Sequence, residues 1–263
     1  MSGGGGIGNG SGSAPALNER QQQMLERITL GGEAKIAELR EAFAVTEMTI
    51  RRDLEKLEAT GLVRRTFGGA IYVGRDVALQ ERAGHMIEEK LRIGRAAAAL
   101  VRPGESIFID GGTTTIEVAR ALPAGFDVTV VTNAMNVALE LVAKQVPVLV
   151  TGGTLLESTS SLVGPVAAQT LSGMAFDRAF LGTTGVSAQH GFSNSNIYEA
   201  EVKKLAIRQA GETNVVLDHT KLGAKVLVSF APLGGVTRIV TDRAPDAAWS
   251  RLLAEGGVEV LVG

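Results

Sequence analysis

Small polar residues that could hold a phosphate group follow one apolar run of the sequence. Residues 106–110 have the pattern of a buried strand, and the Gly- and Thr-rich run 111–115 opens a helix directly after it. Glycines let a ligand approach the backbone closely, while the helix N-terminus offers free N–H groups and a positive dipole end. Asp110, at the carboxyl end of the strand, could accept hydrogen bonds from sugar hydroxyls. An ordinary strand-to-helix turn is the alternative interpretation of this loop.

Comparable loops follow later strands, and in an open parallel sheet such loops line one crevice. They are Thr132-Asn133, Thr151-Gly152-Gly153-Thr154 and Leu181-Gly182-Thr183-Thr184-Gly185. Phosphate recognition also needs cations, for which Lys203 and Lys221 are candidates. Because Glu199 and Lys203 are spaced four residues apart, an exposed salt bridge is the alternative for that pair. The predicted ligand-binding residues are Asp110, Gly112, Thr113, Thr114, Thr115, Asn133, Gly152, Gly153, Gly182, Glu199, Lys203, Asp218 and Lys221.

Guanidinium, hydroxyl and ammonium groups gather on one face of a predicted helix nearer the N-terminus. Ile50, Leu54 and Leu57 form its apolar stripe, and a turn of about 100° per residue directs Met48 and Arg52 away from that stripe. Such a face is suited to the base edges and phosphates of DNA. A helix with a solvated charged face is the alternative, which the near balance of charges in this region favours. The predicted DNA-binding residues are Thr46, Met48, Thr49, Arg51, Arg52, Lys56, Arg64, Arg65, Gly68 and Gly69.

The elements around this helix predict a winged helix-turn-helix. Asn18 can cap a first helix that ends at a Gly-Gly pair, and a second short helix follows it. Thr46 is a good N-cap for the third helix, which runs toward Gly61. Residues 62–73 then read as strand, Gly-containing turn and strand, which is the pattern of a hairpin or wing. Arg65 would lie at the base of the wing, beside a backbone phosphate.

Strands and helices alternate through the rest of the chain. The predicted strands are 106–110, 128–132, 146–151, 178–181, 214–217, 238–241 and 258–262. Helical stretches such as 87–100, 116–122 and 136–144 lie between them. This alternation predicts an α/β fold with a doubly wound, mostly parallel sheet. The predicted organisation is a disordered Gly- and Ser-rich tail over 1–17, a winged helix-turn-helix domain over 18–74, a linker over 75–86 and a ligand-sensing domain over 87–263.

Composition narrows the classes of function. The 263 residues are 45% hydrophobic but only 4% aromatic, which suits Ala-, Val-, Leu- and Ile-rich cores of helices on a parallel sheet. A net charge of −2 argues against a generally basic surface but leaves room for a small DNA-binding domain. With no cysteine, disulfides, thiolate metal sites and cysteine nucleophiles are excluded, and the three histidines are scattered. We therefore expect no metal and no cofactor, a cytoplasmic location, and no membrane span, which needs about 18 apolar residues.

The predicted helix-turn-helix resembles the DeoR family of bacterial repressors, which includes regulators of glycerol-3-phosphate and sugar catabolism. The residues that carry the resemblance are Val45-Thr46-Glu47-Met48-Thr49-Ile50-Arg51-Arg52-Asp53-Leu54, Leu57-Glu58 and Gly61-Leu62-Val63. One departure is Phe67, where the family commonly has histidine before Gly-Gly-Ala. The resemblance implies operator DNA as a partner.

The second domain is similar to the DeoR-family sensor domain. The similar segments are Asp110 with Gly112-Thr113-Thr114, Val131-Thr132-Asn133, Gly152-Gly153, Leu162-Val163-Gly164-Pro165, Phe180-Leu181-Gly182, Glu199-Ala200-Glu201-Val202-Lys203 and Asp218-His219-Thr220-Lys221. That domain is related in fold to ribose-5-phosphate isomerase and coenzyme A transferases, which implies a sugar-phosphate pocket over these loops. His219-Thr220 departs from the pair of small residue and serine usual there.

The favoured interpretation is a transcription repressor that a phosphorylated sugar or polyol releases from operator DNA. It would act as a homodimer or homotetramer, because helix-turn-helix proteins usually bind paired half-sites. The main alternative is a sugar-phosphate isomerase with an accessory domain, in which Asp110, Glu199 or Asp218 would be the general base. A nicotinamide-dependent oxidoreductase is the weaker alternative, because no Gly-x-Gly-x-x-Gly follows an early strand. We therefore expect no catalytic residues.

Overall fold

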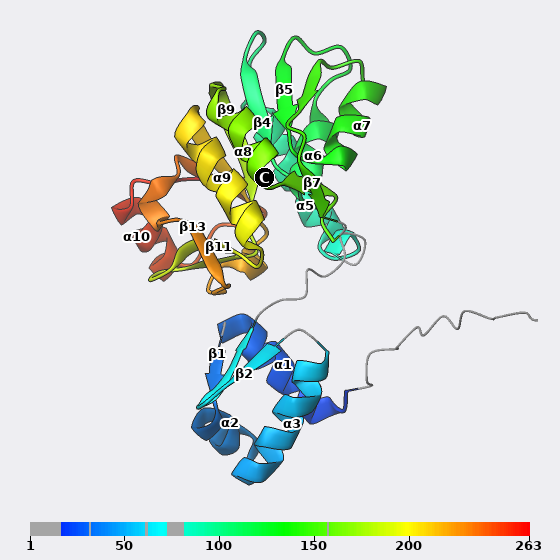
Figure 1. Cartoon of the computed structure of the whole chain (residues 1–263). Helices are drawn as coiled ribbons and strands as arrows, with labels where there is room; N and C mark the ends of the chain where they lie inside the picture. Colours follow the sequence, from blue (N-terminus) through cyan, green and yellow to red (C-terminus); the bar gives the residue numbers. More distant parts are fainter. Residues whose placement is uncertain (1–16, 32, 61–62, 73–81, 157) are drawn as a thin grey trace, which may run out of the picture.

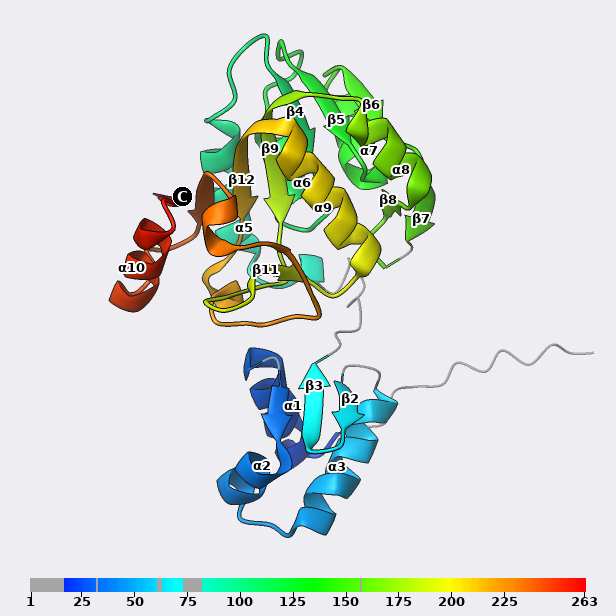
Figure 2. The ribbon, with the colours of Figure 1, turned by 60° about the vertical axis from the view of Figure 1, so that its left-hand side comes forward.

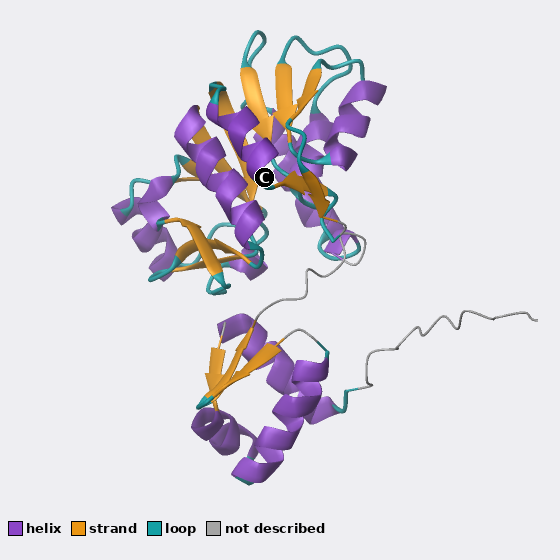
Figure 3. Ribbon diagram, in the orientation of Figure 1, coloured by secondary structure: helices purple, strands orange, loops and turns teal. Residues whose placement is uncertain are grey.

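The computed structural model describes residues 17–31, 33–60, 63–72, 82–156 and 158–263 (Figures 1 and 3). The predicted tail lies outside the described residues except for Leu17. The predicted linker lies outside them up to residue 81. In the described part of the chain, no helix is long and apolar enough to cross a membrane.

The N-terminal unit is a three-helix domain with a small antiparallel sheet, as the winged-helix prediction requires (Figure 1). The strands are ordered β1-β3-β2, so the wing hairpin of β2 and β3 gains a third strand that the sequence did not predict. Its elements are α1 (Glu19–Gly31), β1 (Glu33–Lys35), α2 (Ile36–Phe43), α3 (Glu47–Ala59), β2 (Val63–Thr66) and β3 (Gly69–Tyr72).

Burial and capping explain how α3 is held in this unit. Ile50, Leu54 and Leu57 are buried in one core with residues of α1 and α2, as their spacing predicts. Thr46 caps the helix, because its side chain accepts a hydrogen bond from the backbone N–H of Thr49 at 3.3 Å. These contacts leave the opposite face of α3 to solvent.

The C-terminal unit is built on a seven-stranded sheet in which every neighbouring pair is parallel. All seven predicted strands belong to it. Its elements are α5 (Ile87–Ala98), β4 (Ser106–Ile109), α6 (Thr115–Ala121), β5 (Thr129–Thr132), α7 (Met135–Ala143), β6 (Val148–Val150), β9 (Phe176–Gly182), α9 (Ile197–Gln209), β12 (Ala210–Val216), β14 (Arg238–Thr241), α10 (Ala247–Glu255) and β15 (Glu259–Val262).

Two apolar cores cover the two faces of the sheet, which makes it doubly wound. Phe108 of β4 packs with α8 (Pro165–Ser172), α9 and α10, whereas its neighbours Ile107 and Ile109 pack with α5, α6 and α7. Successive strand residues point to opposite faces, so a strand covered on both sides must be apolar throughout. The expected α/β fold is therefore confirmed.

Shorter strands that the sequence did not predict complete this domain. They form an antiparallel sheet in the order β10-β11-β13 and a separate β7–β8 hairpin. Their bounds are β7 (Thr154–Leu156), β8 (Ser161–Val163), β10 (Gly185–Ser187), β11 (Gly191–Asn194) and β13 (Val228–Ala231).

The strand order changes direction at the centre of the large sheet. Its order is β15-β14-β12-β9-β4-β5-β6, so the chain moves outward from β4 through β5 to β6 and later from β9 toward β15 (Figure 2). Strands β4 and β9 are neighbours at this point, and from them the chain proceeds toward opposite edges of the sheet. Open α/β sheets bind ligands in the crevice at such a switch point, beyond the carboxyl ends of the strands.

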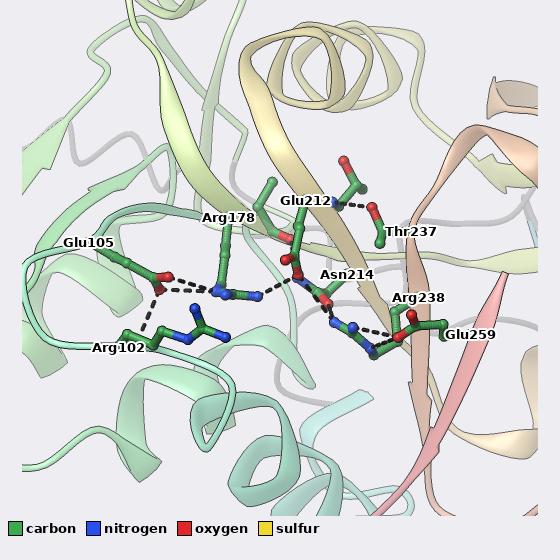
Figure 4. A network of polar contacts seen from close by, with 10 residues as sticks. Arg102, Glu105, Arg178, Glu212, Asn214, Thr237, Arg238 and Glu259 are labelled. Carbon is green, nitrogen blue, oxygen red and sulfur yellow. Dashed lines mark hydrogen bonds and ion pairs between the residues drawn. The ribbon is translucent and has the colours of Figure 1, made fainter.

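Charged side chains fix the opposite, amino end of the sheet (Figure 4). The guanidinium of Arg178 in β9 pairs with Glu105 and Glu212, and Arg238 in β14 pairs with Glu212 and Glu259. Burial alone would lower the pKa of Arg178, but the two glutamates outweigh burial and raise it. Alternating charges thus join the segments around β4, β9, β12, β14 and β15, far along the strands from the switch point.

Candidate functional sites

A cavity of about 500 Å³ lies at the switch point. Its lining comes from the loops after β4, β9 and β12, from the start of α9, and from the segment 82–86 that precedes α5. The predicted ligand-binding residues that line it are Gly112, Thr113, Thr114, Gly182, Glu199, Lys203, Asp218 and Lys221. The convergence expected from the sequence therefore holds for these eight residues.

Two predicted residues support the cavity from below. The Thr115 hydroxyl is buried and donates to the carbonyl of Gly112 at 3.1 Å, which fixes the loop after β4. Asp110 is buried as well, and its Oδ2 accepts hydrogen bonds from Lys203 Nζ and from the backbone N–H of Gly182 at 3.2 Å. Asp110 therefore ties the loop after β4 to the loop after β9 and to helix α9.

The Asp110–Lys203 ion pair is almost completely removed from solvent. The two side chains are 2% and 3% exposed, and the Lys203 ammonium also lies 5.6 Å from the centre of the Phe230 ring. Glu199, one turn earlier on α9, is buried and accepts a hydrogen bond from Asn194 Nδ2 at 2.9 Å. The alternative of an exposed Glu199–Lys203 salt bridge is therefore wrong, because both side chains face the interior and have other partners.

The loop after β12 brings a more accessible pair of charges. Asp218 is buried and its Oδ1 accepts from the backbone N–H of Thr220 at 3.1 Å. Lys221 is about one third exposed, and its ammonium lies 3.9 Å from Asp218 Oδ2, which is a long contact for an ion pair. Lys221 is thus the lysine of the predicted set that a ligand could engage with little rearrangement.

Residues 82–86 form a wall of the cavity that the sequence did not predict. Arg82, His85 and Met86 line the cavity, although they fall in the predicted linker. Lys90 of α5 holds them, because its ammonium donates to the carbonyls of Arg82 and His85 at 2.5 and 2.6 Å. Burial lowers the pKa of Lys90 below its usual value, and the nearby charge of Lys221 acts in the same direction. In the sequence, Lys90 looks like any lysine on an Ala-rich helix.

Three predicted residues lie away from the cavity lining. Asn133 is buried under the β7–β8 hairpin, where its Nδ2 donates to the carbonyl of Leu162 at 3.3 Å. Gly153 has a positive φ, and a Cβ there would lie 2.6 Å from the carbonyl oxygen of Val163. Gly152 also has a positive φ and sits beside Val166. The last two glycines therefore have a conformational reason to be glycine.

His219, which departs from the family pattern, is bound to a neighbouring loop. Its backbone N–H donates to Asp242 Oδ1 at 2.7 Å, and its Nδ1 lies 2.8 Å from Asp242 Oδ2. Burial would raise the pKa of the Asp242 carboxyl, but the hydrogen bonds from His219 outweigh burial and hold the pKa below its usual 3.8. Neither residue joins a larger cluster: the described residues contain no group of three or more histidine, aspartate or glutamate side chains that could hold a metal ion.

The exposed face of α3 is the candidate DNA-binding surface. Met48 is 64% exposed, and Arg52 and Lys56 are exposed on the same helix, as their positions predict. Arg51 is exposed but pairs with Glu47 one turn earlier, with 2.7 Å between Nη2 and Oε1. Thr49 is only partly exposed, because its hydroxyl lies 3.0 Å from the Thr46 hydroxyl in the helix cap.

The wing presents a different set of groups. Arg64 is exposed, whereas the guanidinium of Arg65 pairs with Glu55 and Glu58 of α3, both at 2.8 Å. Gly68 lies in the open turn, with no other atom near the place of a Cβ. Gly69 is buried, because a Cβ there would lie 2.1 Å from the carbonyl oxygen of Ala34 in β1. At the tip, the Phe67 side chain is completely exposed.

Both units match family models that carry the same family name. Residues 20–75 match the DeoR-like helix-turn-helix domain, and residues 85–243 match the DeoR C terminal sensor domain. This chain belongs to the DeoR family. The resemblance seen in the sequence is confirmed, and this DeoR protein is a DNA-binding transcriptional regulator rather than an enzyme. The sensor match includes His85 and Met86, which the sequence analysis assigned to the linker.

Curated relatives are similar over nearly their whole length. The uncharacterized HTH-type transcriptional regulator YulB of Bacillus subtilis is 36% identical over 92% of this chain and 95% of its own. The HTH-type transcriptional regulator GlpR of Haloferax volcanii is 34% identical over 93% of this chain and 97% of its own. The HTH-type transcriptional repressor GlcR of Bacillus subtilis is 36% identical over 83% of this chain and 85% of its own.

Solved structures overlap with this DeoR protein only in part. A ribose 5-phosphate isomerase from Methanocaldococcus jannaschii overlaps with 51% of this chain and 53% of its own, with 18% identity and a TM-score of 0.38. A probable sor operon regulator from Shigella flexneri overlaps with 52% of this chain and 78% of its own, with 11% identity and a TM-score of 0.37. Overlap at this level carries no conclusion about activity.

Proposed function

We propose that this DeoR protein represses a carbohydrate catabolic operon and is released from its operator by a phosphorylated sugar or polyol. The cavity at the switch point is the observation that carries the proposal. Its volume of about 500 Å³ falls in the range of small-molecule sites, which is roughly 300–1,000 Å³. The lining combines hydroxyls, backbone groups and charges of both signs, as a ligand with an anionic end and a hydroxylated end requires.

The phosphate end is assigned to the loop after β4 and to Lys221. Gly112, Thr113 and Thr114 offer backbone N–H groups and hydroxyls at the cavity wall, and Lys221 offers an ammonium. Helix α6 has only seven residues, so its dipole adds little and the loop donors matter more. The hydroxylated end is assigned to the buried carboxylates Glu199 and Asp218, which can accept from sugar hydroxyls.

The DNA end of the proposal rests on α3 and the wing. Arg52 and Lys56 are exposed on the face that the helix-turn-helix motif presents to the major groove, and Arg64 extends the basic surface onto the wing. Because one helix reads few base pairs, the operator is expected to contain repeated half-sites that bind a dimer or tetramer. We propose repression rather than activation because some relatives, such as GlcR, are named repressors. A regulator of this kind acts in the cytoplasm.

The proposal is tested by titrating phosphorylated sugars and polyols while operator binding is followed by fluorescence anisotropy. At least one phosphorylated compound should lower operator affinity by about 5–150-fold, the usual range of allosteric coupling. Its non-phosphorylated counterpart is the matched control and should act far more weakly, since the phosphate donors would be left unpaired. A compound that binds tightly in the cavity and leaves operator affinity unchanged would contradict the proposal.

A further inference from the structure

The phenylalanine at the tip of the wing is the most exposed large hydrophobic side chain in the described part of the chain. Phe67 is completely exposed, whereas the next in order, Leu139, is 67% exposed. All eight phenylalanines lie within the described ranges, and the other seven are buried or partly buried. A single exposed apolar residue needs no explanation by itself, but the place and the setting of Phe67 point to a ligand.

Neither packing nor the shape of the turn accounts for a phenylalanine at this position. Thr66 pairs with Gly69, so Phe67 and Gly68 form a two-residue turn between β2 and β3. Such turns favour glycine, asparagine and aspartate, and none of these preferences calls for an aromatic ring. A side chain without a role inside the domain is available for a contact outside the molecule.

The turn that carries Phe67 is fixed by β1 and by the start of α2. The backbone N–H of Ile36 donates to the carbonyl of Gly68 at 2.8 Å, and β3 pairs with β1. A Cβ on Gly69 would lie 2.1 Å from the carbonyl oxygen of Ala34, so the two backbones are in close contact. Because the turn is already ordered, a ring presented there loses little conformational freedom when it binds.

The wing tip extends toward the N-terminal half of α3. Arg65 pairs with Glu58 in the C-terminal half of the helix, and nearer the tip Thr66 and Gly69 line a cleft together with Arg51 (Figure 2). The N-terminal residues of a recognition helix contact base edges. A duplex that receives α3 therefore also lies beside the wing tip, so DNA is the partner that the exposed ring meets.

The chemistry of the ring identifies the part of the DNA that it contacts. A phenyl ring carries no charge and no hydrogen-bonding group, so it cannot bind a phosphate. The bases offer apolar faces instead. Proteins insert phenylalanine between base steps from the minor groove, which unstacks the step and bends the duplex. Pyrimidine–purine steps are the easiest to unstack.

We propose that Phe67 is a wedge that enters a base step of the operator from the minor groove and bends the DNA. The inference rests on the proposed function in one point, the assignment of α3 as the recognition helix. It adds a residue whose contribution to specificity depends on how easily the DNA is deformed. We therefore expect a pyrimidine–purine step in each half-site at the place of the wing.

The probe is a DNA duplex that the full-length wild-type protein selects from a random library. Dyes on its two ends measure bending by energy transfer, and titration of the protein measures affinity. Phe67→Ala should weaken binding about 10-fold or more and reduce the bend, because the contact between ring and base is lost. Phe67→Leu keeps an apolar wedge and should retain most of the bend. Because the ring is completely exposed, thermal unfolding of Phe67→Ala followed by circular dichroism should match that of the wild type.

Arg64→Ala is the matched control, because Arg64 is exposed on the same hairpin and carries a charge in place of a ring. As a phosphate contact, it should lower the slope of the logarithm of affinity against the logarithm of salt concentration by about one and leave the bend unchanged. Phe67→Ala should show the opposite pattern, with a smaller bend and an unchanged salt slope, since an apolar contact releases no counterions.

The outcomes separate the wedge from the proposed function. A Phe67→Ala variant that binds and bends the selected duplex like the wild type would overturn the wedge alone. Contact with a thymine methyl group in the major groove is the competing arrangement, and uracil in place of thymine removes that methyl group. If wild type and Phe67→Ala bind the uracil duplex equally, the wedge is wrong. Failure of the wild-type protein to select any duplex would overturn both the wedge and the proposed function.

Discussion

Replacing Lys203 by methionine removes the ammonium that neutralises Asp110 and leaves a carboxylate under the floor of the cavity. The two side chains are 3% and 2% exposed, so solvent screens the remaining charge poorly. Breaking a buried ion pair from one side typically costs about 3–5 kcal/mol. The backbone N–H of Gly182 still donates to Asp110 in the variant. The expected loss of unfolding free energy is therefore at the lower end of this range, at about 3 kcal/mol.

Urea unfolding of the full chain measures this loss. Trp249 is the only tryptophan and packs against the core of the sensor domain, so its fluorescence reports on this domain rather than on the winged helix. The variant should unfold at a lower urea concentration with little change in the slope of the transition. Lys221→Met is the matched control. Its ammonium is about one third exposed and 3.9 Å from Asp218, so the loss should stay below about 1 kcal/mol.

A double-mutant cycle decides whether breaking the Asp110–Lys203 ion pair is the cause of the lost stability. Asp110→Asn together with Lys203→Met removes both charges while the asparagine carbonyl can still accept from Gly182. The double variant should therefore lose far less stability than the sum of the two single variants. If Lys203→Met costs under about 1 kcal/mol, or if the two losses simply add, the burial argument for this pair is wrong.

Four further predictions concern the other groups. Arg52→Ala should weaken operator binding by about 1–3 kcal/mol in gel shifts if the arginine contacts a base edge, and unchanged binding would contradict the assignment of α3 as the recognition helix. Thr113→Ala should lower effector affinity in calorimetry and leave operator affinity intact. Lys90→Met should reduce the effect of the ligand on operator affinity, because the carbonyls of the cavity wall lose their donor; an unchanged coupling would exclude this role. Because the folded-state pKa of Asp242 is lowered, its carboxylate stabilises the fold above about pH 3.8, and this contribution disappears as pH falls through the folded-state pKa. Asp242→Asn should therefore flatten the acid side of the stability profile measured by Trp249 fluorescence.

The parallel sheet was predictable because its strands are buried on both faces. Ile107, Phe108 and Ile109 are buried in two different cores, one on each face of the sheet. A strand that is buried on both faces must be apolar at every position, and such a run is recognisable in the sequence. The short strands carry no such signal. Strand β1 reads Glu-Ala-Lys, and it exists because Gly69 leaves room for the backbone of residue 34. That pairing depends on a residue more than thirty positions away, which local patterns do not contain.

The types of residue that line the candidate cavity were predictable, but which strand ends contribute to it was not. The loop sequences predict that every strand end lines one crevice, but the sheet is seven strands wide and neighbouring strands are about 4.8 Å apart. The ends of β5 and β6 are covered by the β7–β8 hairpin, whose Ser161 abuts Gly111 and whose Leu162 bonds to Asn133. Burial of Lys203 and the role of Lys90 depend on tertiary packing, since each lysine lies in an ordinary helical pattern.

The cavity wall offers a route by which the proposed effector would influence the DNA-binding domain. A ligand changes operator affinity only if it binds the DNA-competent and DNA-free states differently. Arg82 and His85 line the cavity and follow the last wing strand by about ten residues of chain, which can span at most about 35 Å. Lys90 joins their carbonyls to α5, and Met86 begins that helix with a positive φ that few residues other than glycine adopt. Under the proposed function, we therefore expect an effector that contacts this wall to act on the segment that leads to the DNA-binding domain.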